Sequence, residues 1–147
     1  EKNVARICSL FSGAAKYSQW DSSDQSGCRV LVIDNVGMLN SLYQYGEVAY
    51  IGGGLGKGIH NTLEPAAFGL PIIFGPKYEK FEEARQFVAR GGAFPVRDAG
   101  ALTTALQQLQ DQAFYQRARA AVTGYLDNSK GATTLALEWL ESRFPRL

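Results

Sequence analysis

A glycine-rich turn is the segment of this sequence best suited to chemistry. Five glycines fall within seven residues: Gly52, Gly53, Gly54, Gly56 and Gly58. Apolar residues 48–51 run directly into this turn, which also carries Lys57 and is followed by His60. Glycine lets the backbone adopt positive φ and lets a ligand approach closely. Where a helix follows such a turn, its unpaired N–H groups and its positive dipole end attract anions. The turn therefore predicts a phosphate site.

The turn matches neither of two common phosphate-binding patterns. The P-loop pattern needs a glycine where Ile51 stands, and Ser or Thr where Gly58 stands. The dinucleotide pattern, counted from Gly52 and Gly54, needs its third glycine at Lys57. The sequence thus indicates neither an NTPase nor a nicotinamide enzyme. A flexible loop at a strand end is the alternative interpretation of the turn.

The residues after the turn have two interpretations. Asn61 and Glu64 have the spacing of a capping box, which satisfies helix N-terminal donors without a ligand. Alternatively, Glu64 accepts hydrogen bonds from sugar hydroxyls, and the spacing alone does not decide between these roles. His60 is the only histidine, and a lone loop histidine is more often structural than catalytic. His60 and Glu64 are four residues apart, but further metal ligands are not evident, so no metal is expected.

Two further polar clusters follow apolar runs. Lys77 and Lys80 come after residues 71–74 and form either a solvated face or a surface toward an acidic substrate. Residues 34–38 follow the run at 30–33. Their composition favours a turn and a helix cap.

Strands and helices are predicted to alternate along the chain. Continuous apolar runs, typical of strands buried on both faces, occur at 30–33, 48–51 and 71–74. Shorter strands are expected at 14–20 and 93–96. Helices are expected at 1–11, 37–46, 61–69 and 81–92, and over the remainder of the chain with a linker at 127–131. This order predicts an α/β fold: a Rossmann-like parallel sheet with helices on both faces and extra C-terminal helices. In such sheets ligands bind beyond the carboxyl ends of the strands, where the polar clusters lie.

Composition excludes several classes of protein. The 147 residues suffice for one domain, and 46% apolar and 12% aromatic residues argue against disorder. Fifteen Lys and Arg against 14 Asp and Glu give a net charge of +1, which argues against a nucleic-acid-binding domain. Two cysteines and one histidine are too few for a disulfide framework or a structural zinc site. No run approaches the ~18 apolar residues of a membrane span. The first residue is Glu1 rather than Met, from which we expect processing or a longer parent protein.

Three motifs carry a resemblance to a known family. Residues 52–55, 60–69 and 71–76 read G-G-G-L, H-N-T-L-E-P-A-A-F-G and P-I-I-F-G-P, and Phe81, Asp34 and Gly37 also match. The segment at about 30–97 thereby resembles the 3-deoxy-D-manno-octulosonic acid (Kdo) transferases of bacterial lipopolysaccharide synthesis. That family's pattern is roughly G-G-S-L, G-G-H-N-x-L-E-P-A-A, P-x-x-x-G-P and N-F. This sequence departs from the pattern at five positions: Met38, Gly54, Ile59, Lys77 and Lys80. A contact that the family makes through the backbone at these positions does not depend on the side chain.

The resemblance implies the C-terminal half of a two-domain GT-B glycosyltransferase. Residues 1–147 would form a nucleotide-sugar-binding domain, with CMP-Kdo as donor and a lipid A precursor as acceptor. The general base and the acceptor site would lie in an N-terminal domain, so no catalytic residue and no activity are expected in this segment alone. No cofactor is implied. The full-length protein would associate with the cytoplasmic face of the bacterial inner membrane.

The resemblance also implies roles for individual residues. Gly53, Gly54 and the N–H groups near His60 and Asn61 would hold the CMP phosphate. Glu64 would bind the ribose hydroxyls. Gly37 and Met38 would border the cytosine through backbone groups, and Lys77 is a candidate for the donor sugar carboxylate. A phosphate oriented on a helix N-terminus would stabilise the departing CMP without a metal.

Two alternatives stay open at this point. One is another GT-B enzyme, such as a UDP-sugar transferase or epimerase. The other is a non-catalytic nucleotide-binding α/β domain.

Overall fold

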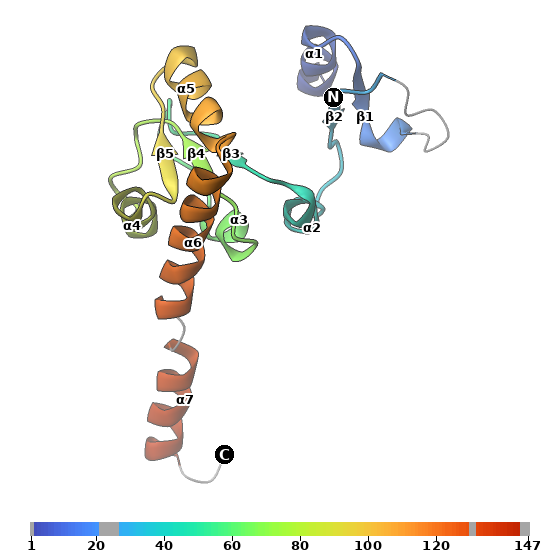
Figure 1. Cartoon of the computed structure of the whole chain (residues 1–147). Coiled ribbons are helices and arrows are strands. Elements are labelled where there is room, and N and C mark those ends of the chain that lie inside the picture. Colours follow the sequence, from blue (N-terminus) through green and yellow to red (C-terminus); the bar gives the residue numbers. More distant parts are fainter. Residues whose placement is uncertain (1, 21–26, 130–131, 145–147) are drawn as a thin grey trace. The chain divides into compact units, whose positions relative to one another are not determined.

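The computed structural model describes residues 2–20, 27–129 and 132–144 (Figure 1). The chain divides into two compact units: an N-terminal unit, Glu1–Leu42, and a C-terminal unit, Tyr43–Leu147. Each unit holds its own parallel sheet. The assignment of all 147 residues to one nucleotide-sugar-binding domain stays a prediction.

The N-terminal unit is a two-stranded parallel sheet with a helix on it. Its elements are α1 (Lys2–Leu10), β1 (Ala14–Lys16), the 3₁₀ turn η1 (Tyr17–Gln19), β2 (Val30–Val32) and α2 (Leu39–Leu42). In the register of the sheet, Ala14 lies opposite Val30 and Lys16 opposite Val32. Gly13 has φ +76°, and the N–H groups of Arg29 and Val30 both donate to its carbonyl oxygen. A side chain at Gly13 would overlap the Gly27 carbonyl, so glycine is required at this entry to β1.

The C-terminal unit contains a three-stranded parallel sheet. Its elements are η2 (Tyr43–Tyr45), β3 (Ala49–Ile51), α3 (Leu63–Ala67), β4 (Ile72–Phe74), α4 (Glu82–Arg90), β5 (Ala93–Pro95), α5 (Ala99–Leu109), α6 (Gln112–Ser129) and α7 (Ala132–Arg143). The strand order is β3-β4-β5, and Ile51, Phe74 and Pro95 share one register position. The carboxyl ends of the three strands therefore meet at one edge of the sheet.

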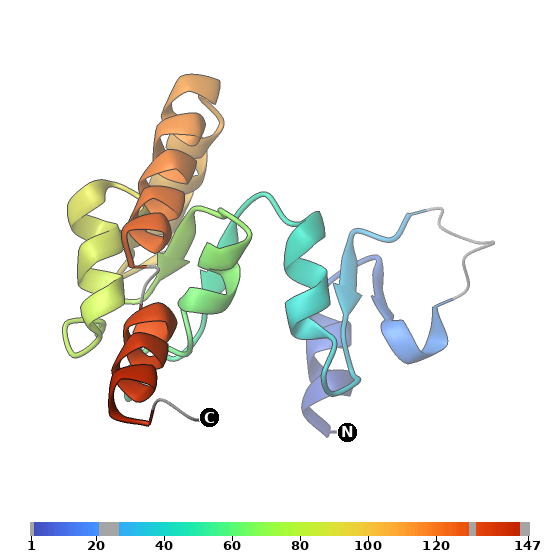
Figure 2. The same cartoon turned by 90° about the horizontal axis from the view of Figure 1, so that it is seen from below.

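Helices cover both faces of this sheet. Successive residues of β4 belong to different core clusters, because side chains alternate between the faces of a strand. Ile72 and Phe74 pack with Phe87 of α4 and Val122 of α6, whereas Ile73 packs with residues of α5 and with Ala118 of α6. Helix α6 runs alongside α3, α4 and α5 (Figures 1 and 2). The predicted α/β fold, with helices on both faces of a parallel sheet, is confirmed.

Helix α6 packs so closely against the start of β5 that only glycine fits at position 92. A Cβ atom on Gly92 would lie 2.6 Å from Cγ2 of Val122 and 3.1 Å from its nitrogen. Arg119 Nε also donates to the carbonyl oxygen of Gly69 at 3.1 Å, which ties α6 to the turn before β4. The helix thereby fixes the segment that carries α3.

Three predicted elements differ most from the structure. The strand expected at 14–20 ends at Lys16, and Tyr17–Gln19 form the 3₁₀ turn η1. The linker expected at 127–131 is wrong for residues 127–129, which are the last turn of α6, and residues 130–131 lie outside the described ones. The single helix expected at 37–46 is divided into α2 and the 3₁₀ turn η2. Among the described residues, no helix combines the length and the apolar character that crossing a bilayer requires.

Candidate functional site

The glycine turn after β3 is held by hydrogen bonds between its own backbone groups. The N–H groups of Gly56 and Gly58 donate to the Gly53 carbonyl oxygen at 2.8 and 3.3 Å, and His60 N donates to Gly52 O at 3.2 Å. Gly53 has φ +90° and Gly58 has φ +146°, values that side chains rarely tolerate. The turn is therefore held by hydrogen bonds of its own backbone at the carboxyl end of β3.

This turn is in direct backbone contact with the turn after β4. Lys77 N donates to Gly54 O at 3.1 Å. A Cβ atom on Gly54 would lie 2.7 Å from both N and Cα of Gly75. The departure from serine at position 54 thus has a steric basis, since a side chain would separate the two turns.

Among the described residues, several backbone donors in and after the turn are unpaired, those of the exposed Gly53 and Asn61 and that of the buried Gly54. None of the hydrogen bonds within the described part of the chain uses the N–H groups of Gly53, Gly54 or Asn61. The exposed side chains of Lys57 and His60 are close to these donors in the sequence. The exposed Lys77 belongs to the turn after β4, whose backbone contacts Gly54. Free N–H groups together with nearby positive side chains suit an anion such as a phosphate.

Asn61 and Glu64 are hydrogen-bonded to each other. Asn61 Nδ2 donates to Glu64 Oε1 at 2.9 Å, and Asn61 Oδ1 accepts from Leu63 N at 2.9 Å. The capping box that the spacing predicted is not formed, because Thr62 rather than Asn61 is the N-cap of α3. Asn61 instead satisfies the N–H of Leu63, the first residue of the helix. Glu64 is half-buried and oriented by Asn61, and its second oxygen accepts none of the hydrogen bonds of the described residues. That oxygen leaves Glu64 able to accept a ligand hydroxyl as well.

Tyr43 packs beside this carboxylate. Its ring lies 6.1 Å from that of Phe68, and both rings border the core. Burial, and secondly the negative charge of Glu64, raise the pKa of the Tyr43 phenol above its ordinary value of 10.0. In the folded chain Tyr43 thus keeps its proton at a higher pH than in the unfolded chain. Its contribution to stability is complete below pH 10 and is lost as the pH rises through the folded pKa.

We expect Glu64→Gln to lower the pKa of Tyr43 while leaving it above 10.0, because burial is the larger of the two causes. NMR titration of a chain carrying ¹³C-labelled tyrosine measures this change. Tyr115, whose hydroxyl donates to Glu47 O, serves as the internal control, and its NMR signals at neutral pH should be the same in both proteins. An unaltered Tyr43 titration in the variant would contradict the proximity of the two side chains.

Thr62 is a functional candidate that the sequence did not suggest. It is fully buried, and within the described residues its hydroxyl has no hydrogen-bond partner. An N-cap threonine normally accepts from the N–H of the second or third helical residue. The third residue of α3 is Pro65, which has no N–H, and Thr62 has helical backbone angles, φ −101° and ψ −15°. An unpaired buried hydroxyl of this kind costs about 1–3 kcal/mol.

We expect Thr62→Val to leave the free energy of unfolding unchanged or to raise it by about 1 kcal/mol, because valine keeps the shape without the unpaired hydroxyl. Urea unfolding followed by circular dichroism measures the difference. Thr103→Val is the matched control, since the exposed Thr103 hydroxyl donates to Ala99 O. A destabilisation by Thr62→Val clearly larger than that of the control would mean that the Thr62 hydroxyl is paired.

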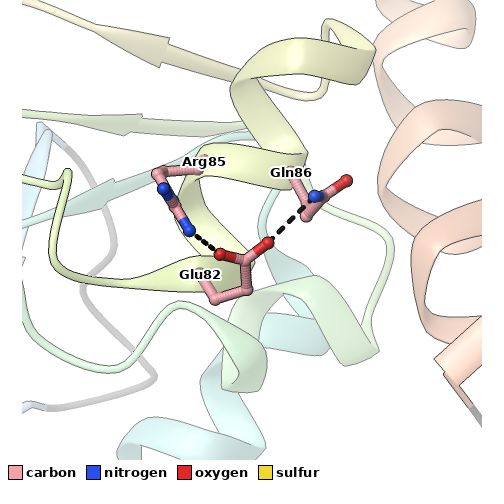
Figure 3. Close-up of polar contacts among 3 residues, drawn as sticks. All are labelled: Glu82, Arg85 and Gln86. Carbon is pink, nitrogen blue, oxygen red and sulfur yellow. Dashed lines mark hydrogen bonds and ion pairs between the residues drawn. The ribbon is translucent and has the colours of Figure 1, made fainter.

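The charged residues at the start of α4 are paired with one another. Glu82 accepts a hydrogen bond from Gln86 Nε2 at 2.9 Å and forms an ion pair with Arg85 (Figure 3). Glu82 also lies in the first helical turn, where a negative charge stabilises the helix dipole. Arg85 is therefore engaged within α4, whereas Lys77 and Lys80 are exposed in the preceding loop.

Residues 34–38 form a turn in the N-terminal unit. Gly37 has φ +91°, as a turn requires, so this part of the prediction is confirmed. The carboxylate of Asp34 caps no helix. It accepts hydrogen bonds from N and Oγ of Ser18, at 3.0 and 2.6 Å, and these bonds hold the pKa of Asp34 below its ordinary value. Ser18 was not among the predicted site residues.

The predicted site residues are divided between the two units. Gly53, Gly54, His60, Asn61, Glu64 and Lys77 lie in the C-terminal unit at or after the carboxyl ends of β3 and β4. Gly37 and Met38 lie in the N-terminal unit, and their participation in the same site stays a prediction. Among the described residues, no group of three His, Cys, Asp or Glu side chains could hold a metal ion.

A parallel α/β sheet with open N–H donors in a glycine turn at a strand end is typical of nucleotide-binding domains. The fold matches the crystal structure of the C-terminal CMP-Kdo binding domain of WaaA from Acinetobacter baumannii. The TM-score is 0.75 and the identity 25%, over 85% of this chain and 67% of that chain.

Kdo transferases also match in sequence. The 3-deoxy-D-manno-octulosonic acid transferase of Aquifex aeolicus is 38% identical over 82 residues, which are 54% of this chain and 23% of the relative. That of Bordetella pertussis is 36% identical over 115 residues, 76% of this chain and 27% of the relative. The chain spans about a quarter of the length of these relatives. No protein-family model matches the chain. The resemblance of this chain to the C-terminal domain of Kdo transferases is thereby confirmed.

Proposed function

We propose that this chain is the donor-nucleotide-binding domain of a glycosyltransferase that transfers Kdo from CMP-Kdo to a lipid A precursor. The observation that carries the proposal is the glycine turn at the end of β3, held against the β4 turn with the N–H groups of Gly53 and Gly54 unused. The same arrangement presents the Glu64 carboxylate, oriented by Asn61, a few residues further along the chain. The resemblance to a CMP-Kdo binding domain supports this choice of ligand.

In this proposal the chemical groups of CMP-Kdo bind to complementary groups of the chain. The N–H groups of the glycine turn and of Asn61, with His60 nearby, bind the CMP phosphate. Glu64 binds the ribose hydroxyls. Lys77 faces the sugar carboxylate. Fixed N–H dipoles stabilise the negative charge that develops on CMP as the bond to Kdo breaks.

The proposal assigns the remaining functions to the rest of a longer enzyme. The general base and the lipid A precursor site belong to an N-terminal domain, so the chain alone should transfer no Kdo. Association with the cytoplasmic face of an inner membrane belongs to that whole enzyme. The chain is then one of two domains in a GT-B glycosyltransferase of lipopolysaccharide synthesis.

Nucleotide binding tests the proposal directly. We expect CMP to raise the free energy of unfolding by about 2.7 kcal/mol at a concentration about 100 times its Kd. CDP, UMP and UDP are compared in the same thermal-shift experiment. A preference for UDP over CMP would favour a UDP-sugar transferase or epimerase instead. No shift with any of the four would favour a non-catalytic domain.

A further inference from the structure

The ring of Phe81 lies against the end of the glycine turn. It occupies the space that a side chain on Gly58 would take, since a Cβ atom there would lie 3.2 Å from Cε2 and 3.4 Å from Cζ of the ring. The carbonyl oxygen of Lys77 is further from the same position, at 3.9 Å. A glycine has no side chain with which to pack, so Gly58 depends on this neighbouring ring for a packing contact.

Gly58 is in turn in direct contact with Gly53. The N–H of Gly58 donates to Gly53 O at 3.3 Å, and a Cβ atom on Gly53 would overlap the carbonyl oxygen of Gly58. The two glycines therefore lie side by side, and a shift of Gly58 displaces Gly53. No hydrogen bond of the described residues uses the Gly53 N–H, which is one of the donors proposed for the phosphate.

Phe81 is itself held in place by its backbone and by its ring. Its N–H donates to Tyr78 O at 2.9 Å, and its carbonyl oxygen accepts from Arg85 N of α4 at 3.1 Å. The ring packs against the core cluster that contains Ile59 and Phe74. A side chain packed against a close-packed core has little room to move, so the ring is a firm support for the turn.

We propose that Phe81 is a positioning residue for phosphate binding. It acts through Gly58, whose place sets that of the Gly53 N–H. The inference rests on the proposed function, in which this N–H binds the CMP phosphate. Donors of a binding site must keep their positions to within about 0.5 Å. A turn that has lost the support of Phe81 therefore binds the phosphate less tightly.

The ribose contact does not depend on the same support. Glu64, which the proposed function gives to the ribose hydroxyls, is oriented by its hydrogen bond from Asn61. A change at Phe81 should therefore weaken the binding of the phosphate and leave the binding of the nucleoside intact. A purely structural role of Phe81 would weaken both alike.

The experiment compares CMP with cytidine, which lacks the phosphate, by NMR titration of the full 147-residue chain. We expect Phe81→Leu to lower the preference for CMP over cytidine by about tenfold, the loss expected for one hydrogen bond to a charged group. Leucine keeps an apolar side chain but lacks the ring that reaches Gly58. The affinity for cytidine should stay as in the wild type. Backbone order parameters of Gly53–Gly58 in the free protein should fall.

Phe114→Leu is the matched control. Phe114 is also half-buried, and its ring packs on the other core cluster of the same unit, 5.6 Å from the ring of Phe94. The same loss of a ring lowers the free energy of unfolding at either position. It should leave the preference for CMP and the order parameters of the glycine turn unchanged only in Phe114→Leu.

The two measurements decide the inference between them. A preference lowered in Phe81→Leu and kept in Phe114→Leu supports it. An unchanged preference in Phe81→Leu overturns it, and so does an equal loss of CMP and cytidine binding or an equal effect of the control. If the wild-type chain binds neither ligand, the proposed function fails. The order parameters then still test the support of the turn, and equal values in Phe81→Leu and the wild type overturn it.

Discussion

Gly75→Ala is expected to lower the free energy of unfolding of the C-terminal unit by about 1–3 kcal/mol, the usual cost of overpacking a close contact. The new Cβ atom would overlap the carbonyl carbon of Gly54 and lie 2.6 Å from Leu55 N. These are backbone atoms, which cannot rotate aside as a flexible side chain can. The two turns must therefore separate, and the hydrogen bond from Lys77 N to Gly54 O is lost.

The same substitution should weaken CMP binding by about tenfold or more, because the donors of Gly53 and Gly54 move from their positions. Urea unfolding and calorimetric titration with CMP measure the two effects. Gly56→Ala is the control from the same turn, since its Cβ atom would meet only Gly53 O, at 3.4 Å. Unchanged stability in Gly75→Ala would mean that the two turns are further apart than described.

Glu64→Gln is expected to weaken CMP binding by about 10- to 100-fold, because hydrogen bonds to a charged group contribute about 1.5–3 kcal/mol. Glutamine keeps the size of the side chain and an oxygen for Asn61 Nδ2, so α3 should remain folded. The lower affinity for CMP then measures what the negative charge of Glu64 contributes to binding the ribose hydroxyls.

A second nucleotide separates this role from helix capping. Wild-type protein should prefer CMP to 2′-deoxy-CMP, and the variant should lose most of that preference. Glu79→Gln is the control, because Glu79 is an acidic residue of the same unit that is exposed and lies outside the proposed site. If Glu64→Gln changes stability and leaves both affinities intact, Glu64 serves only the start of α3.

The parts of the fold that depend on local pattern were predictable from the sequence. The apolar run at 71–74 predicted a strand buried on both faces, and Ile72, Ile73 and Phe74 are fully buried. Helix boundaries were harder to predict. Asp127, Asn128 and Ser129 favour turns, yet they continue α6, because extending an existing helix costs far less than starting one.

In the candidate site, too, contacts between residues close in the sequence were predictable and contacts between distant residues were not. Asn61 and Glu64 are three residues apart, and this spacing suggested that they interact, but as a capping box rather than through the side-chain hydrogen bond that they form. The Ser18–Asp34 pair spans 16 residues and depends on the register of two strands, which no local pattern contains. The contact between Gly54 and Gly75 likewise arises from the pairing of β3 with β4. Thr62 is a local case that the sequence analysis missed. Pro65, three residues later, has no N–H, so the sequence already indicated that the Thr62 hydroxyl would lack its usual partner.

The hydrogen bonds within the glycine turn bear on the entropy of ligand binding. A loop of five glycines has many accessible conformations when unfolded, and ordering it is costly. Here Gly53 O accepts two N–H groups and Gly54 O accepts a third, so the ordering occurs when the chain folds. A phosphate then meets donors that are already in place and immobilises little further backbone. Backbone order parameters of Gly53–Gly58 measured with and without CMP should therefore be nearly equal.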